Sequence, residues 1–86
     1  MNTADRTAAL RRAILSELSS CGGHLVPERA IVNAMYAISE PAPTKLDVRN
    51  ALQWLLDSDF VVSVNPTMSG SVKWRITDNG EAALHA

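Results

Sequence analysis

The sequence predicts a mainly helical α+β fold with one small β-hairpin, formed by a single domain over residues 1–86. Three stretches in the first two thirds of the chain repeat apolar residues at helical spacing. Two later runs alternate apolar and polar residues with the period of a strand. The expected order of elements is therefore helix, short strand, helix, helix, strand, loop, strand and helix. A chain of 86 residues is too short to divide into two ordinary domains.

The composition is typical of a globular protein, with 47% hydrophobic and 20% charged residues. Eight Lys and Arg against nine Asp and Glu give a net charge of -1, so the chain does not coat nucleic acid by bulk charge. No apolar run approaches the roughly 20 residues that cross a bilayer, and the first residues do not resemble a signal peptide. We therefore expect a cytoplasmic protein. A large substrate cavity is difficult to build at this size, which argues against an enzyme.

The first expected helix begins near Thr3, a suitable N-cap, and ends near Ser20, because Gly22 and Gly23 follow. Apolar residues recur along it at helical spacing: Ala8, Leu10, Ile14, Leu15 and Leu18. The remaining surface is expected to be solvated and carries three arginines, Arg6, Arg11 and Arg12. The segment His24–Val26 is too short for an independent strand, and we expect it to form an edge strand of one or two bridges.

Two further helices follow. Pro27 suits the first turn of the second helix, expected over Glu28–Ile38. The apolar stripe of that helix is expected to consist of Ala30, Ile31, Ala34, Met35 and Ile38. Thr44 opens the third helix and approximates a capping box with Asp47. One face of this helix is expected in the core, namely Val48, Ala51, Leu52 and Leu55. The opposite face carries Leu46, Asn50, Gln53 and Asp57, with Trp54 at its border.

The last third of the chain predicts a hairpin and a short helix. The two strands are separated by a long loop, residues 65–71. Their inward faces are expected to be Phe60, Val62 and Val64 on one strand and Val72, Trp74 and Ile76 on the other. Thr77 is the expected N-cap of a final helix over residues 78–84. We expect this helix to have little to pack against, because it offers only Ala82, Ala83 and Leu84.

Taken in this order, the elements resemble a winged helix-turn-helix, and three stretches carry the resemblance. The stretch Arg12–Leu18 is similar to the opening helix of many bacterial winged-helix regulators. Val48–Val61 resembles a recognition helix that runs through a short acidic turn into an apolar strand. Trp74–Leu84 is similar to the strand, capping threonine, glycine and small-residue helix that follow the wing. The helix-turn-helix would cover residues 27–58 and the wing hairpin residues 60–77.

In size, the chain resembles the small winged-helix proteins of Mu-like phages and prophages that are commonly labelled ArsR-type regulators. The resemblance implies a transcriptional regulator that binds double-stranded DNA, with the third helix in the major groove and the wing on the backbone or minor groove. The implied base-reading side chains are Lys45, Arg49, Asn50 and Gln53. The implied phosphate contacts come from the Thr44 backbone amide, Lys73 and Arg75. We expect a homodimer, since two half-sites multiply specificity.

The alternative is a winged-helix module that binds a protein partner and no DNA. The third helix with its exit turn, residues 44–59, carries two cations against three carboxylates, and the loop over residues 65–71 has no cation. This near-neutral charge, together with Leu46 and Trp54 on the outer side, favours a protein partner.

The sequence predicts no metal site, no cofactor and no catalytic residues. Cys21 and His24 have a spacing that is found in metal sites, but His85 is the only further His or Cys in the chain. A nucleophilic cysteine also needs a base and a third group that orients the base, and no such group is evident near Cys21.

Overall fold

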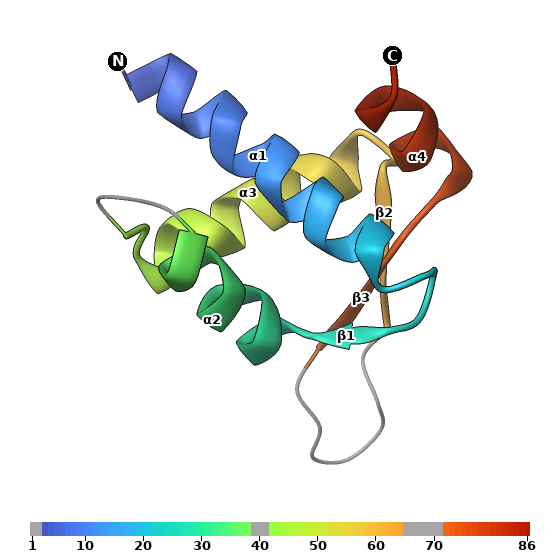
Figure 1. Cartoon of the computed structure of the whole chain (residues 1–86), viewed down its shortest axis with the longest axis horizontal. Coiled ribbons are helices and arrows are strands. Elements are labelled where there is room, and N and C mark those ends of the chain that lie inside the picture. The colour runs from blue at the N-terminus through green and yellow to red at the C-terminus, as the bar shows by residue number, and fades with distance from the viewer. Residues whose placement is uncertain (1–2, 39–41, 65–71) are drawn as a thin grey trace.

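The computed structural model describes residues 3–38, 42–64 and 72–86 (Figure 1). The helices and strands within these residues are α1 (Thr3–Ser20), β1 (Val26–Pro27), α2 (Glu28–Ile38), α3 (Lys45–Asp57), β2 (Val61–Val64), β3 (Lys73–Ile76) and α4 (Asp78–Leu84). The predicted order of elements is confirmed. The loop expected between the hairpin strands, residues 65–71, lies outside the described residues.

Helix α1 is the element around which the other helices are arranged. It contacts α2, α3, α4 and strand β3, and Figure 1 shows it crossing in front of α3. Its second half is buried in the core through Ile14, Leu15 and Leu18. Its first half contributes less, because Ala8 is exposed and Leu10 is only partly buried. The helix already includes Thr3, so that residue is not the N-cap that the sequence predicted.

Helix α2 has the predicted bounds but a narrower apolar face than predicted. Ile31 and Met35 are fully buried, whereas Ala30 is exposed and Ile38 is 62% exposed. Val32 is buried in their place, on the side of α2 that faces the start of α3. The predicted apolar stripe was too wide. Helix α2 contacts both α1 and α3, so its buried side faces the space between these two helices.

Helix α3 begins with the predicted capping box. The Thr44 Oγ1 accepts a hydrogen bond from the Asp47 backbone N–H at 3.0 Å, and the Asp47 carboxylate accepts one from the Thr44 N–H at 3.0 Å. This second hydrogen bond lowers the pKa of Asp47 below its usual value of 3.8, with a smaller contribution from the positive charge of Arg6. The predicted core residues of α3 are all buried: Val48, Ala51, Leu52 and Leu55.

Helix α3 ends in a tight turn in which Asp59 takes a left-handed conformation, with φ of 65°. The Asp59 N–H donates to the Leu56 carbonyl at 3.0 Å, and the Phe60 N–H donates to the Leu55 carbonyl at 2.9 Å. This pair of hydrogen bonds is a Schellman motif, which more often has glycine at the left-handed position. The carboxylate of Asp59 also accepts a hydrogen bond from the Asn79 side chain at 2.8 Å.

The three strands form an antiparallel sheet in the order β1-β3-β2. The predicted edge strand is confirmed, with Val26 opposite Trp74 and Pro27 opposite Lys73. The sequence predicted Pro27 in the first turn of the second helix, but Pro27 lies in β1 and α2 begins at Glu28. An edge position suits proline, because its missing N–H faces away from the ladder.

The predicted inward face of β2 is wrong by one residue. Val61 is fully buried, Val62 is half-buried and Val64 is 42% exposed. The register places Val61 opposite the buried Ile76, so the two share the inner face of the sheet. The turn at Asp59 sets this phase, because Phe60 still belongs to the end of α3 and the alternation begins only at Val61. The prediction for β3 was correct for Trp74 and Ile76.

Helix α4 is held more firmly than the sequence predicted. The Thr77 side chain caps it by accepting a hydrogen bond from the Gly80 N–H at 3.0 Å. Leu84 is buried, and its carbonyl accepts a hydrogen bond from the Arg12 guanidinium at 2.9 Å. Ser19 of α1 donates to the Glu81 carboxylate at 3.1 Å. These contacts fix α4 against α1.

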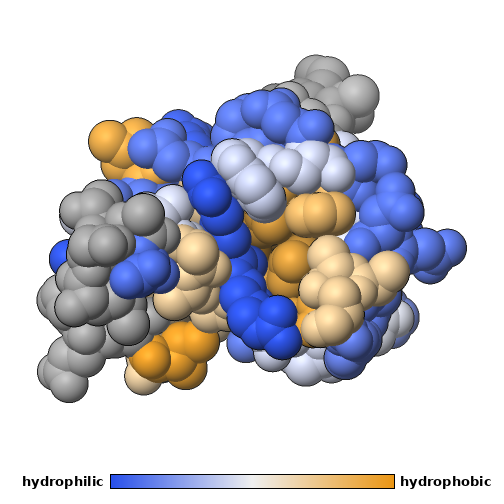
Figure 2. All heavy atoms as spheres, turned by 90° about the horizontal axis from the view of Figure 1, so that it is seen from above, coloured by the Kyte–Doolittle hydropathy of each residue, from blue (hydrophilic) through white to orange (hydrophobic). Residues whose placement is uncertain are grey.

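The arrangement of these elements is that of a winged helix-turn-helix, as the sequence predicted. Helices α2 and α3 are consecutive and contact one another, and the antiparallel pair β2 and β3 follows directly. Figure 2 shows the side on which α1 and α4 lie, where hydrophilic residues form most of the surface and apolar atoms appear both right of the middle and at the left edge.

We expect Gly80→Ala to lower the free energy of unfolding by about 1–3 kcal/mol, as overpacking of a close contact does. A methyl group at this position would lie against the Phe60 carbonyl oxygen and 2.7 Å from the Ile76 Cγ1. Urea unfolding followed by circular dichroism measures the change, and Ser16→Ala on the exposed side of α1 is the control. A Gly80→Ala protein as stable as the wild type would contradict the close approach of α4 to this turn.

We expect Thr44→Ala to cost about 1 kcal/mol of stability, the usual effect of losing an N-cap, whereas Thr44→Ser keeps the hydroxyl and most of the stability.

Asp47→Asn removes a carboxylate whose pKa is lower in the folded than in the unfolded state. Its stabilisation is therefore complete above pH 4 or so and is lost as the pH falls through the lowered pKa. The stabilities of Asp47→Asn and wild type should converge in acid; a constant difference in thermal unfolding at all pH values would contradict this.

Candidate nucleic-acid interface

Helix α3 leaves one long face open to solvent. With 100° between successive residues, Leu46, Asn50 and Gln53 lie on the side opposite its four buried residues. All three are exposed, and Leu46 is exposed by 63%. The side chains that the sequence placed on the outer face are therefore available to a partner over about two turns of the helix.

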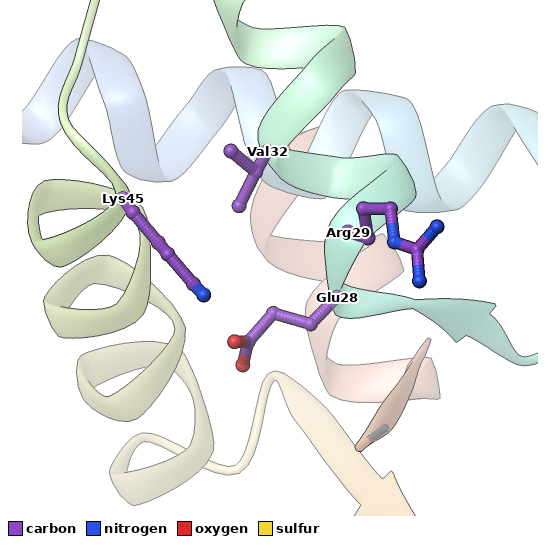
Figure 3. A pocket seen from close by; sticks show the side chains of 4 residues that line it. All are labelled: Glu28, Arg29, Val32 and Lys45. Atoms are coloured by element: carbon purple, nitrogen blue, oxygen red, sulfur yellow. The ribbon is translucent and has the colours of Figure 1, made fainter. Parts of the chain in front are cut away.

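The flank of α3 that faces α2 carries two cations, Lys45 and Arg49, and a shielded carboxylate of α2 lies beside them. The Arg49 guanidinium lies 3.5 Å from the Glu28 carboxylate, and the two side chains are 63% and 12% exposed. Beside this pair is a cleft of about 310 Å³ lined by Glu28, Arg29, Val32 and Lys45. Figure 3 shows the Lys45 and Glu28 side chains directed into the cleft from opposite helices, and the Arg29 side chain directed away from it.

The flank that faces α1 carries an aromatic group covered by a cation. The Arg11 guanidinium lies 4.1 Å from the centre of the Trp54 ring, and Phe60 packs at 6.1 Å with its ring inclined by 56°. Trp54 remains 42% exposed. The prediction of a solvated face was wrong for Arg11, whose Nε is buried. Arg12 is exposed as predicted, but it also donates a hydrogen bond to the Leu84 carbonyl of α4. Both arginines hold α1 against its neighbours.

Besides Arg49, two of the predicted contact groups already have partners within the chain. The Thr44 amide donates to Asp47, so a phosphate at this helix end would compete with an attached carboxylate. The Gln53 side chain donates to the Asp57 carboxylate at 2.9 Å. Asn50 differs from them, since its side chain makes no hydrogen bond within the described part of the chain.

The predicted wing residues lie on the sheet. Lys73 and Arg75 are exposed on the outer face of β3, and the buried Trp74 and Ile76 alternate with them. The register places Val64 and Val62 of β2 opposite these cations. The structure thus joins Lys45, Arg49, Asn50 and Gln53 on α3, and it places Lys73 and Arg75 on a separate element of the same fold.

The structure adds two residues that the sequence analysis did not select. Glu28 restrains the Arg49 side chain, and Arg29 lies exposed at the start of α2 beside the same cleft. The signal in the sequence was their place directly after Pro27, because the first turn of the second helix lies beside the start of the third in this fold. Sequence reasoning treated them only as helix-starting residues.

The net charge of the open α3 face is close to zero. Lys45 and Arg49 are balanced by Asp47 and Asp57. Within residues 3–38, 42–64 and 72–86, no group of three His, Cys, Asp or Glu residues could hold a metal ion. None of the described helices is long and apolar enough to cross a membrane.

The fold has counterparts among solved structures. The proposed transcriptional regulator TA0346 from Thermoplasma acidophilum superimposes with a TM-score of 0.79 at 17% identity, over 99% of this chain and 80% of that one. A mutant of ZitR from Lactococcus lactis in its apo form superimposes with a TM-score of 0.63 at 20% identity. This second match covers 95% of this chain and 60% of the ZitR chain.

No protein-family model matches the sequence, and no curated protein matches it. At these identities the structural similarity establishes the fold, which is a winged helix shared with proteins from an archaeon and a bacterium.

Proposed function

We propose that this protein is a transcriptional regulator that binds double-stranded DNA through α3 and the β2–β3 hairpin. The observation that carries the proposal is the open face of α3, which presents Asn50 and Gln53 beside a flank that carries the cations Lys45 and Arg49. A helix with this distribution fits the major groove, where base edges are read by hydrogen bonds and phosphates lie on both sides. The name of one structural neighbour, the proposed transcriptional regulator TA0346, agrees with this role.

The side chains divide into two groups by their chemistry. Arg49, Asn50 and Gln53 can form paired hydrogen bonds with base edges, Arg with guanine and the amides with adenine. Lys45, Lys73 and Arg75 contribute positive charge to phosphates, which raises affinity without reading sequence. Arg49 must exchange its contact with Glu28 for a contact with DNA, and Gln53 must likewise leave Asp57. Binding therefore replaces interactions that the free protein already makes.

The proposal includes a homodimer, since one domain of 86 residues reaches few base pairs and two copies double the contacts. The side that bears α1 exposes apolar atoms among hydrophilic residues, which a second copy of the chain could cover (Figure 2). The proposal also keeps the prediction of a cytoplasmic protein of the small phage and prophage type labelled ArsR, without a catalytic role.

A protein-binding module without DNA affinity is the competing function. It is favoured by the balanced charge of α3 and by two exposed apolar side chains on that helix, Leu46 at 63% and Trp54 at 42%. Trp54 is already covered in part by Arg11 and Phe60, however, so it offers less free area than an isolated tryptophan. Measurement of DNA binding as a function of salt separates the two functions.

We expect the protein to bind a mixed-sequence duplex weakly at low salt and to lose affinity as salt rises, with a slope set by its phosphate contacts. Arg49→Ala should weaken binding to a preferred sequence by about 1–3 kcal/mol, and Lys73→Ala should reduce the salt slope by about one. Fluorescence anisotropy with a labelled duplex measures both. Arg49→Lys is the matched control, because it keeps the charge and loses the paired hydrogen bonds. Absence of binding at low salt would favour the protein-binding module.

We expect Glu28→Gln to strengthen DNA binding severalfold at low salt. The substitution removes a carboxylate beside the cleft and weakens the restraint on Arg49, which lies 3.5 Å away. The gain should shrink as salt rises, because it is electrostatic. Glu17→Gln removes the same charge from α1 and serves as the control in the same titration. Unchanged or weaker binding by Glu28→Gln, with the fold intact by circular dichroism, would place Arg49 outside the DNA interface.

A further inference from the structure

Leu46 is an apolar side chain at the start of a polar face of α3. It is the second residue of α3 and is 63% exposed, more than any other large apolar residue of the described chain. Asn50 follows one turn later and Gln53 nearly two turns later, so the three side chains form one stripe along the helix. The stripe thus combines one aliphatic group with two amides.

The neighbours of Leu46 on α3 do not extend it into an apolar patch. Lys45 and Asp47 adjoin it in the chain, and Arg49 and Asn50 lie one turn further along. Trp54 lies on the other flank, where Arg11 stacks on its ring at 4.1 Å. A protein-docking surface is usually a contiguous apolar area, whereas a single aliphatic group between amides and cations is not.

This combination of groups matches one kind of base pair. In the major groove an A·T pair presents the thymine methyl group beside the adenine N7 acceptor and N6 donor. Asn pairs with the two adenine groups through its amide, and an aliphatic side chain contacts the methyl group. A G·C pair has no methyl group, and the arginine suited to its guanine, Arg49, is directed toward Glu28 on the flank of the helix.

We propose that α3 selects A·T base pairs in the major groove, with Leu46 on the thymine methyl group and Asn50 on adenine. The inference rests on the proposed DNA-binding function and adds the class of sequence that the site prefers. From Leu46 to Gln53 the helix rises by about 10 Å, which corresponds to about three base pairs. We assign adenine to Asn50 because its side chain has no internal hydrogen bond to break among the described residues, whereas the Gln53 side chain is hydrogen-bonded to Asp57.

The test begins with the full-length protein and a pool of duplexes randomised over 20 base pairs or so, selected at low salt and sequenced. We expect the enriched sequences to share A·T pairs within each half-site. Uracil is then substituted for thymine at each enriched position, which removes only the methyl group. We expect about fourfold weaker binding at one position per half-site, as for the loss of one buried methyl group.

The variant Leu46→Ala should bind more weakly and should no longer distinguish thymine from uracil at that position. Leu46 is exposed, so its loss leaves the core intact, and circular dichroism checks the fold. Ile38→Ala is the matched control, because Ile38 is 62% exposed and lies on α2. It should keep the full thymine preference.

Three outcomes would overturn the inference. Enriched sequences without a shared A·T pair, or equal binding of thymine and uracil duplexes by the wild type, would remove the methyl contact while leaving DNA binding in place. A uracil effect that persists in Leu46→Ala would assign the contact to another residue. If the protein retains no duplex at low salt, the proposed function itself is contradicted. The initial selection from the randomised pool distinguishes this outcome from the others.

Discussion

The turn at Asp59 and Phe60 is the constraint on which the rest of the structure depends. It ends α3 with two hydrogen bonds, to Leu55 and Leu56, and its left-handed residue directs the chain into β2. The same two residues receive the start of α4, because the Phe60 carbonyl accepts from the Thr77 N–H and the Asp59 carbonyl accepts from the Thr77 hydroxyl. One turn therefore joins α3, the sheet and the last helix.

The open face of α3 is a consequence of how both ends of the helix are fixed. The capping box of Thr44 and Asp47 sets its first turn, and the Asp59 turn sets its last. With both ends fixed, four buried residues face α1, α2 and β2, and no described element covers the opposite side. The core thus determines the rotation of α3 about its own axis. Because one side of the helix is buried, the residues on the opposite side are exposed to solvent.

The sequence predicted what depends on local patterns and missed what depends on contacts between distant residues. The bounds of α2, the capping box and the buried side of α3 follow from helical spacing and from Thr44 with Asp47. The inward face of β2 could not be predicted in this way. An alternating pattern does not say which residue points inward first until the preceding turn is known, and that turn has Asp59 where glycine is the usual signal. The contacts of Arg11 with Trp54 and of Arg49 with Glu28 join residues from different helices. No spacing in the sequence encodes such pairs.

The acidic residues that balance the charge of α3 are also those that order its polar side chains. Asp47 completes the cap, Asp57 binds Gln53, and Glu28 binds Arg49 from the neighbouring helix. For a DNA-binding helix this arrangement weakens attraction to phosphates in general, because each cation has a nearby carboxylate. A base pair that hydrogen-bonds to Asn50 and packs against Leu46 adds contacts without breaking any interaction inside the described part of the protein. Under the proposed function, the near-neutral face lowers non-specific affinity for DNA and leaves the contacts of Asn50 and Leu46 to discriminate between sequences.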